Sequence, residues 1–218
     1  MAERRVDRTG TVPRTRAADP GRATRRWNAS RPGGCGRLGG MPTFVTLLRA
    51  INVGARMYKM ADLRTCLADS GLRDVETYIQ TGNVRFTTSL RSRSKVEQHV
   101  EQALAAGCGF DVPAIVLTPA ELRRVYDDAM ALPSPLPGEP RRYVTFLKSD
   151  PPEDAVGPID AWDYDGERAR VVGRAVHVWL TKSSHEAKFS NARFERSLGV
   201  ATTRDLKVVA TLAERWGE

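Results

Sequence analysis

The segment from Thr43 to Gly54 carries apolar residues on both faces of an extended strand. A short strand that is apolar on both sides is typical of a central strand covered by other layers on each face. Arg49 interrupts this pattern just before the turn-forming residues 52–54. Because an unpaired buried guanidinium is costly, we expect Arg49 to find acceptors in the fold.

The pattern that follows alternates helices with short strands. We expect, in order, a helix at 60–70 ending at Gly71, strands at 75–79 and 84–87 joined by a hairpin at 80–83, a helix from Ser94 to Gly107, a strand at 112–117 and a helix at 118–131. The two later helices each begin with a capping box, Ser94 with Glu97 and Thr118 with Glu121. The order strand, helix, strand, strand, helix, strand is that of a ferredoxin-like unit.

Residues 132–140 contain four prolines and a glycine, which predicts a linker. Beyond it we expect strands at 143–147, 167–172 and 175–180, a short helix at 151–160, and two closing helices at 191–198 and 203–215. This second set is a weaker copy of the first, without a strict sequence repeat. In the strand at 175–180, an aliphatic face alternates with a face that carries His177 and Trp179.

These elements predict an α+β protein with two ferredoxin-like halves packed together and a helical C-terminus. The predicted parts are an Arg-rich extension at 1–40, a first half at 41–132, a linker at 133–140 and a second α+β half at 141–218.

Charge separates the extension from the rest of the chain. Residues 1–40 hold ten arginines against three acidic residues, so only one of the eight net positive charges belongs to residues 41–218. Its composition predicts disorder, since it has almost no apolar periodicity. A transit peptide, a phosphate-binding arm, or an upstream extension before a true start at Met41 all fit this composition.

The sequence lacks the motifs of disulfide-bonded, membrane-spanning, metal-binding and dinucleotide-binding proteins. The three cysteines have no paired spacing, which favours a reducing compartment, and we expect a cytoplasmic protein. No apolar run is long enough for a membrane span. The histidines and cysteines lack metal-ligand spacing, and no phosphate-binding or dinucleotide loop occurs, so we expect neither a metal nor a cofactor.

Candidate chemistry is limited to anion binding. Four cations lie beside turns or expected helix starts, where backbone amides also attract anions: Arg49, Lys59, Lys188 and Arg204. We expect 202–204 to open the last helix, whose N-terminus favours negative charge. The predicted ligand-binding residues are Arg49, Asn52, Lys59, Gln80, Asn83, Lys188, Thr203 and Arg204, and no catalytic residue is assigned.

The same residues also fit a structural role. Thr202 and Asp205 have capping-box spacing without any ligand. Arg49 has Asp205 and Glu195 as alternative partners in a clamp between the halves. The turn at 80–83 suits Gly and Asn for conformational reasons alone, because both tolerate positive φ.

Five segments together resemble a bacterial family known as domain of unknown function 1697. They are LLRAINVG (47–54), KMADLR (59–64), TYIQTGNVRF (77–86), AKFSNARFERSLGV (187–200) and ATTRDLKVVATLAE (201–214). The resemblance begins at Met41 and implies a duplicated α+β fold with two ferredoxin-like halves, without an established activity. The chain departs from the family pattern at Ala50 and Ala55, where Gly is typical, at Asp205, where Asn is typical, and at Ala187 and Phe189, where Ser and Leu are usual.

Three classes of function remain. The first is binding of a phosphate- or carboxylate-bearing small molecule between the halves. The second is an interaction or regulatory module, and the third is nucleic-acid binding through the basic extension, because the nearly neutral remainder is unsuited to it. The sequence specifies neither a reaction nor an oligomeric state.

Overall fold

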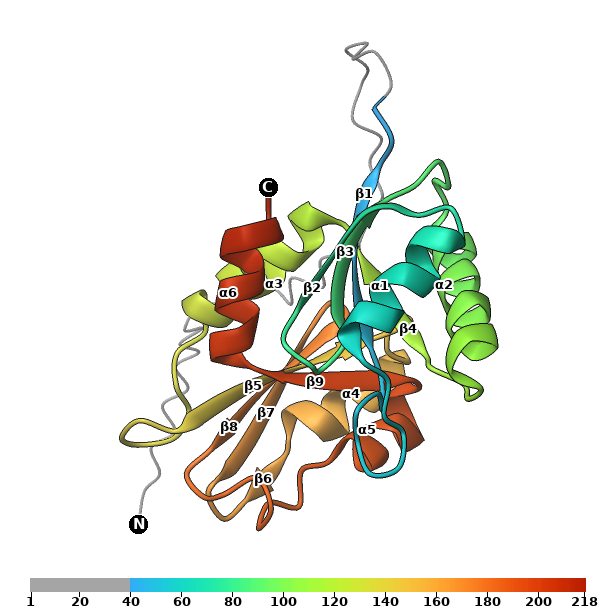
Figure 1. Cartoon of the computed structure of the whole chain (residues 1–218). Helices are drawn as coiled ribbons and strands as arrows, with labels where there is room; N and C mark the ends of the chain where they lie inside the picture. The colour runs from blue at the N-terminus through green and yellow to red at the C-terminus, as the bar shows by residue number, and fades with distance from the viewer. Residues whose placement is uncertain (1–39) are drawn as a thin grey trace, which may run out of the picture. The chain divides into compact units, whose positions relative to one another are not determined.

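The computed structural model describes residues 40–218, and the expectations for the Arg-rich extension concern residues outside this part. Residues 40–218 form two antiparallel sheets and six helices, so the chain is a mixed α+β protein with a C-terminal helix (Figure 1). None of these helices combines the length and the apolar character that a membrane crossing requires.

The first sheet has the strand order β2-β3-β1-β4, with β1 in its interior. Its half contains β1 (Thr43–Leu48), α1 (Met60–Asp69), β2 (Arg73–Tyr78), β3 (Asn83–Thr87), α2 (Arg93–Cys108), β4 (Ala114–Leu117) and α3 (Pro119–Ala131). β1 pairs with β3 on one side and β4 on the other, as its apolar pattern predicts. Phe44 and Leu48 pack beneath α1 and α2, whereas Val45 and Leu47 face the opposite core.

The second sheet repeats this order. It contains β5 (Arg141–Leu147), α4 (Glu153–Asp160), β6 (Asp163–Tyr164), β7 (Glu167–Val172), β8 (Ala175–Leu180), α5 (Asn191–Leu198), β9 (Ala201–Asp205) and α6 (Leu206–Trp216). The strand order is β6-β7-β8-β5-β9, which matches the first sheet once the short edge strand β6 is set aside. The weak copy predicted from the sequence is therefore a repeat of topology.

A shared apolar core joins the two sheets. Val45 and Leu47 of the first sheet belong to the same cluster as Val144 and Phe146 of the second. Helices α3 and α6 contact each other and add Leu122, Val209 and Leu212 to this cluster (Figure 1). Each sheet thus buries one face against its own two helices and the other against the opposite half.

One predicted helix start is wrong. α2 begins at Arg93, with Ser92 at the N-cap and no capping hydrogen bond from a side chain, so the Ser94–Glu97 capping box is absent. Glu97 instead points inward and accepts a 3.2 Å hydrogen bond from the backbone N–H of Val116. The Glu97 carboxylate, which the local sequence pattern predicts as part of a helix cap, therefore binds the backbone of β4 instead. The box at Thr118 and Glu121 is present, as predicted.

The start of the last helix is also wrong. α6 begins at Leu206, three residues later than expected, and residues 202–204 belong to β9. Asp205 is the N-cap and accepts a 2.8 Å hydrogen bond from the backbone N–H of Lys207. Residues 202–204 are extended because β9 pairs with β5. A local helix-capping pattern cannot predict pairing with a strand so distant in sequence.

Candidate functional site

Arg204 lies at the centre of a buried polar network between the halves. Its guanidinium donates to Asn83 Oδ1 at 2.6 Å, to the carbonyl oxygens of Leu48 at 3.0 Å and Thr81 at 2.8 Å, and to Thr202 Oγ1 at 2.8 Å. Only 7% of the residue is exposed. Burial lowers the pKa of Arg204 to about 10, and all the acceptors named here are neutral. The network ties the end of β1 and the β2–β3 turn to β9.

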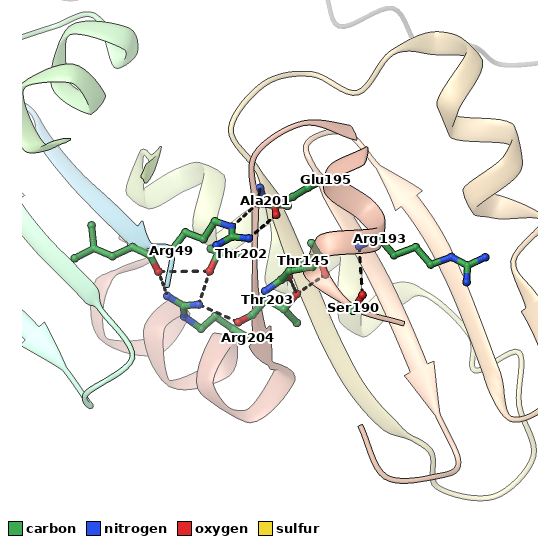
Figure 2. A network of polar contacts seen from close by, with 11 residues as sticks. Arg49, Thr145, Ser190, Arg193, Glu195, Ala201, Thr202, Thr203 and Arg204 are labelled. Carbon is green, nitrogen blue, oxygen red and sulfur yellow. Dashed lines mark hydrogen bonds and ion pairs between the residues drawn. The ribbon is translucent and has the colours of Figure 1, made fainter. Parts of the chain in front are cut away.

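Arg49 forms the second link between the halves. It makes a bidentate ion pair with Glu195 of α5, whose carboxylate also accepts from the backbone N–H of Ala201 (Figure 2). The hydrogen bonds that Arg49 donates to the Glu195 carboxylate raise the pKa of Arg49. Burial acts to raise the pKa of Glu195, but its hydrogen bonds from Arg49 and Ala201 outweigh this effect and lower it. Of the two acidic partners expected for Arg49, Glu195 is therefore the one in contact.

The turns around this network have constrained backbones. Ala50, Asn52 and Ile79 have φ values of 54°, 56° and 49°, a region that residues with a Cβ seldom occupy. The Asn52 side chain donates to the Gln80 carbonyl oxygen at 2.9 Å and accepts from the Tyr58 backbone N–H at 2.7 Å. At Gly82, with φ of 74°, an added Cβ would lie 2.6 Å from Ile51 Cγ2. These contacts hold the two turns against each other.

The structure brings together only part of the predicted ligand set. Arg49, Asn52, Gln80, Asn83 and Arg204 are linked through the contacts above, in which Gln80 takes part by its backbone. Their side chains and carbonyl groups bind one another, which is the arrangement that a clamp requires.

The remaining three predicted residues have other surroundings. Lys59 is exposed at the N-cap of α1. Thr203 Oγ1 lies 2.7 Å from Thr145 Oγ1 and donates to Asn191 Oδ1. The Lys188 ammonium lies 4.5 Å from the centre of the Tyr164 ring.

A cavity lies between α3, the start of β5 and the start of α6. We call it the α3–α6 cavity; it has a volume of about 550 Å³, and its lining includes Tyr126, Met130, Arg141, Arg142, Asp205 and Lys207. α3 comes from the first half and the other elements from the second, so both halves contribute to the wall. This site was not predicted from the sequence because the expected strand began at residue 143, after the two arginines.

Arg142 is the most unusual group of the α3–α6 cavity. Its guanidinium is half-buried, donates to the Ala129 carbonyl oxygen and lies 5.4 Å from the centre of the Trp179 ring. Burial lowers the pKa of Arg142. Within residues 40–218, Arg142 forms no ion pair, so its charge is not neutralised by a neighbouring carboxylate.

The charges around the α3–α6 cavity favour an anion by a small margin. Three cations, Arg141, Arg142 and Lys207, face two acidic residues, Glu139 and Asp205. Asp205 is already engaged as the cap of α6. The cavity also has apolar and aromatic walls from Met130 and Tyr126, so it suits a ligand that combines an anionic group with an apolar part.

Two further cavities lie within single halves. One, between α1 and α2, is lined by Tyr58 and the free thiol of Cys66. The other is lined by Trp162 and Arg193, whose guanidinium lies 4.5 Å from the centre of that indole ring. In the described part of the chain, no group of three or more metal-ligating side chains is close enough to hold an ion.

Comparisons with known proteins identify a family without an assigned activity. The profile of the family described as "Protein of unknown function (DUF1697)" matches residues 41–177. A conserved bacterial protein, SP0830 from Streptococcus pneumoniae, has a similar solved structure, with a TM-score of 0.60 and 21% sequence identity over 82% of this chain and 100% of that one. No curated protein matches. At this identity the structural likeness concerns the fold alone, whereas the profile covers more than half of the chain, which therefore belongs to the DUF1697 family.

Proposed function

We propose that the protein binds an anionic small molecule, bearing a phosphate or carboxylate group, in the α3–α6 cavity. The observation that carries this proposal is the half-buried guanidinium of Arg142, which has no carboxylate partner within residues 40–218 and lines the cavity. A partly desolvated cation without a counter-charge is less favourable than a paired one, and a bound anion relieves that cost.

The neighbouring groups add to this attraction. Arg141 and Lys207 are exposed at the same cavity, where they are free to approach a bound anion. Its volume of about 550 Å³ lies within the range of small-molecule sites. The sequence led us to expect an anion site between the halves, where the end of the first strand meets the start of the last helix. The site proposed here is instead at the start of α6, against α3 and the start of β5.

For the network at Arg49 and Arg204 we propose the structural role. All the named acceptors of Arg204 are protein groups, and Arg49 already holds a carboxylate, that of Glu195. A ligand would have to displace these contacts before it could bind either guanidinium. Lys59 and Gln80 are exposed beside this network, and their predicted role in ligand binding remains a separate proposal.

The test is a thermal-shift screen of the full chain against phosphate, pyrophosphate, sugar phosphates and di- and tricarboxylates. A ligand at about 100 times its Kd stabilises the fold by about 2.7 kcal/mol. We expect Arg142→Met to abolish the shift and Arg123→Met, on the exposed face of α3, to leave it unchanged. Absence of any hit, or a hit that survives Arg142→Met, would overturn the proposal.

A second candidate function is an interaction module. Val53, Met57, Ile79 and Val200 are 66%, 64%, 43% and 37% exposed, and they are four of the five large exposed hydrophobic residues within 40–218. All four lie in loops next in sequence to residues of the Arg49–Arg204 network, and a patch of exposed apolar side chains there would serve as a binding surface. Light scattering at high concentration tests self-association, which we expect Val53→Asp combined with Met57→Asp to abolish. A strict monomer would count against a second copy as the partner.

We also propose that each half is ferredoxin-like and that the protein works in a reducing compartment, the cytoplasm. The repeated strand order supports the first proposal. Cys66 and Cys108, which are free thiols, support the second.

A further inference from the structure

Unpaired buried polar atoms gather on one strand of the second sheet. Within residues 40–218, four buried side-chain polar atoms lack a hydrogen-bond partner, and three of them are His177 Nδ1, His177 Nε2 and Trp179 Nε1 of β8. Both residues are only 2% exposed. Since the great majority of buried polar atoms are hydrogen-bonded, three unpaired atoms on two neighbouring side chains require a physical explanation.

The protonation state of His177 defines what the pair offers. Burial, assisted by the positive charge of Arg142, lowers the pKa of His177 to about 4. The imidazole is therefore neutral at pH 7, with one ring nitrogen as donor and the other as acceptor. Together with the indole N–H of Trp179, the pair presents two donors and one acceptor without partners.

Strand register places this pair beside the α3–α6 cavity. Arg142 of β5 is directly opposite Trp179 of β8, and Val144 is opposite His177, so the four side chains share one face of the sheet. Arg142 lines the cavity and also lies over the indole ring at 5.4 Å. Trp179 and His177 do not themselves line the cavity. Arg142, which does, contacts the indole ring of Trp179, and His177 follows on the same face of β8.

We infer that the ligand of this cavity is nucleotide-like, with a heteroaromatic ring that Trp179 and His177 recognise and an anionic group that Arg142 binds. This inference rests on the proposed function of the same cavity. Arg142 turns from the indole toward the anion, and the ring of the ligand takes its place against Trp179. A heteroaromatic ring offers both a π face for stacking and adjacent donors and acceptors for the imidazole and the indole N–H.

A purely structural explanation makes a different prediction. If Trp179 and His177 only fill space, replacing either by Phe removes unpaired polar atoms and affects no ligand. Both explanations expect the two variants to fold: His177→Phe removes unpaired polar atoms, whereas Trp179→Phe also loses buried packing volume and should lower the melting temperature. Binding is the readout that distinguishes them.

The experiment is isothermal titration of the full chain with inorganic phosphate, ribose 5-phosphate and the 5′-monophosphates of adenosine, guanosine, cytidine and uridine. We expect at least one nucleotide to bind about tenfold or more tightly than ribose 5-phosphate, the gain of about one good hydrogen bond or stacking contact. Trp179→Phe and His177→Phe should each remove most of this gain. The matched control Trp162→Phe, whose indole lies in the separate core of the second half, should keep it.

Each other outcome is decisive. Equal affinities for ribose 5-phosphate and all the nucleotides, or a nucleotide preference that survives both substitutions, would overturn the inference while the anion site of Arg142 stands. If none of these compounds binds but another anion does so through Arg142, the proposed function holds and the nucleotide-like ligand is wrong. Absence of binding by every anion tested would overturn both.

Discussion

Arg204 and Arg142 lie on neighbouring strands of one sheet. Folding buries the side chain of Arg204 and half-buries that of Arg142, yet their surroundings differ. Arg204 has neutral acceptors for each of its nitrogens and closes the gap between the halves. Arg142 has one carbonyl acceptor, an aromatic ring and a cavity. A satisfied buried cation stabilises a junction, whereas an unsatisfied one beside a cavity indicates a ligand.

The largest expected effect is that of removing Arg204. Arg204→Met removes the donor of the Thr81 carbonyl oxygen and of Asn83 Oδ1, and it leaves the Leu48 carbonyl oxygen with only a 3.4 Å hydrogen bond from Thr202. We expect a loss of about 3–5 kcal/mol of unfolding free energy, as for other broken buried networks. Urea denaturation followed by circular dichroism measures this loss. A change below about 1 kcal/mol would remove the contrast with Arg142.

The next effect concerns pH. The pKa of His177 is about 4 in the folded protein and near 6.5 when unfolded, so between these values the unfolded chain binds more protons. The contribution of His177 to the free energy of unfolding is complete above about pH 6.5. It is lost as the pH falls toward 4, and the total loss amounts to about 3 kcal/mol. Denaturation curves of the parent and His177→Phe between pH 4 and 7 test this. A plot of unfolding free energy against pH should be flatter for His177→Phe than for the parent, and as steep as the parent for His99→Gln. Parallel plots for the parent and His177→Phe would contradict the prediction.

The Arg49–Glu195 pair should contribute less. Its side chains are 27% and 20% exposed, so solvent screens part of the attraction. In a double-mutant cycle with Arg49→Ala and Glu195→Ala, we expect a coupling free energy of about 1–2 kcal/mol. The contribution of Glu195 should fall as the pH drops through its lowered pKa, because protonation removes its charge. A cycle whose coupling is zero would show that the pair does not clamp the halves.

The smallest effect on stability is predicted for Arg142→Met. The substitution removes one hydrogen bond to Ala129, but it also removes a desolvated charge, and methionine retains much of the apolar contact with Trp179. We expect a change within about 1 kcal/mol of the parent in the same urea assay. A loss as large as that of Arg204→Met would mean that Arg142 is structural and would weaken the proposed ligand site.

The sequence predicts well what local chemistry decides. The capping box at Thr118 and Glu121 is formed within four residues, and the pattern identifies it correctly. The strands at 167–172 and 175–180 are also found as predicted, because Gly173, with φ of 54°, marks the turn between them.

Elements decided by distant partners were predicted poorly. Glu97 resembles a capping residue, but its carboxylate binds the backbone of β4. Residues 202–204 resemble a helix start, but they pair with β5. The α3–α6 cavity was not predicted for the same reason, since Arg142 and Lys207 are far apart in sequence and the wall is completed by Tyr126 and Met130 of α3, from the other half.

The contacts of Arg204 also bear on how the chain is synthesised. The carbonyl oxygens of Leu48 and Thr81 emerge from the ribosome more than a hundred residues before the guanidinium that binds them. Domains fold from the N-terminus as the chain grows, at about 5–20 residues per second. For several seconds the nascent first half therefore exposes the apolar face that β5 and α6 later cover, and this interval is when the polypeptide most needs a chaperone.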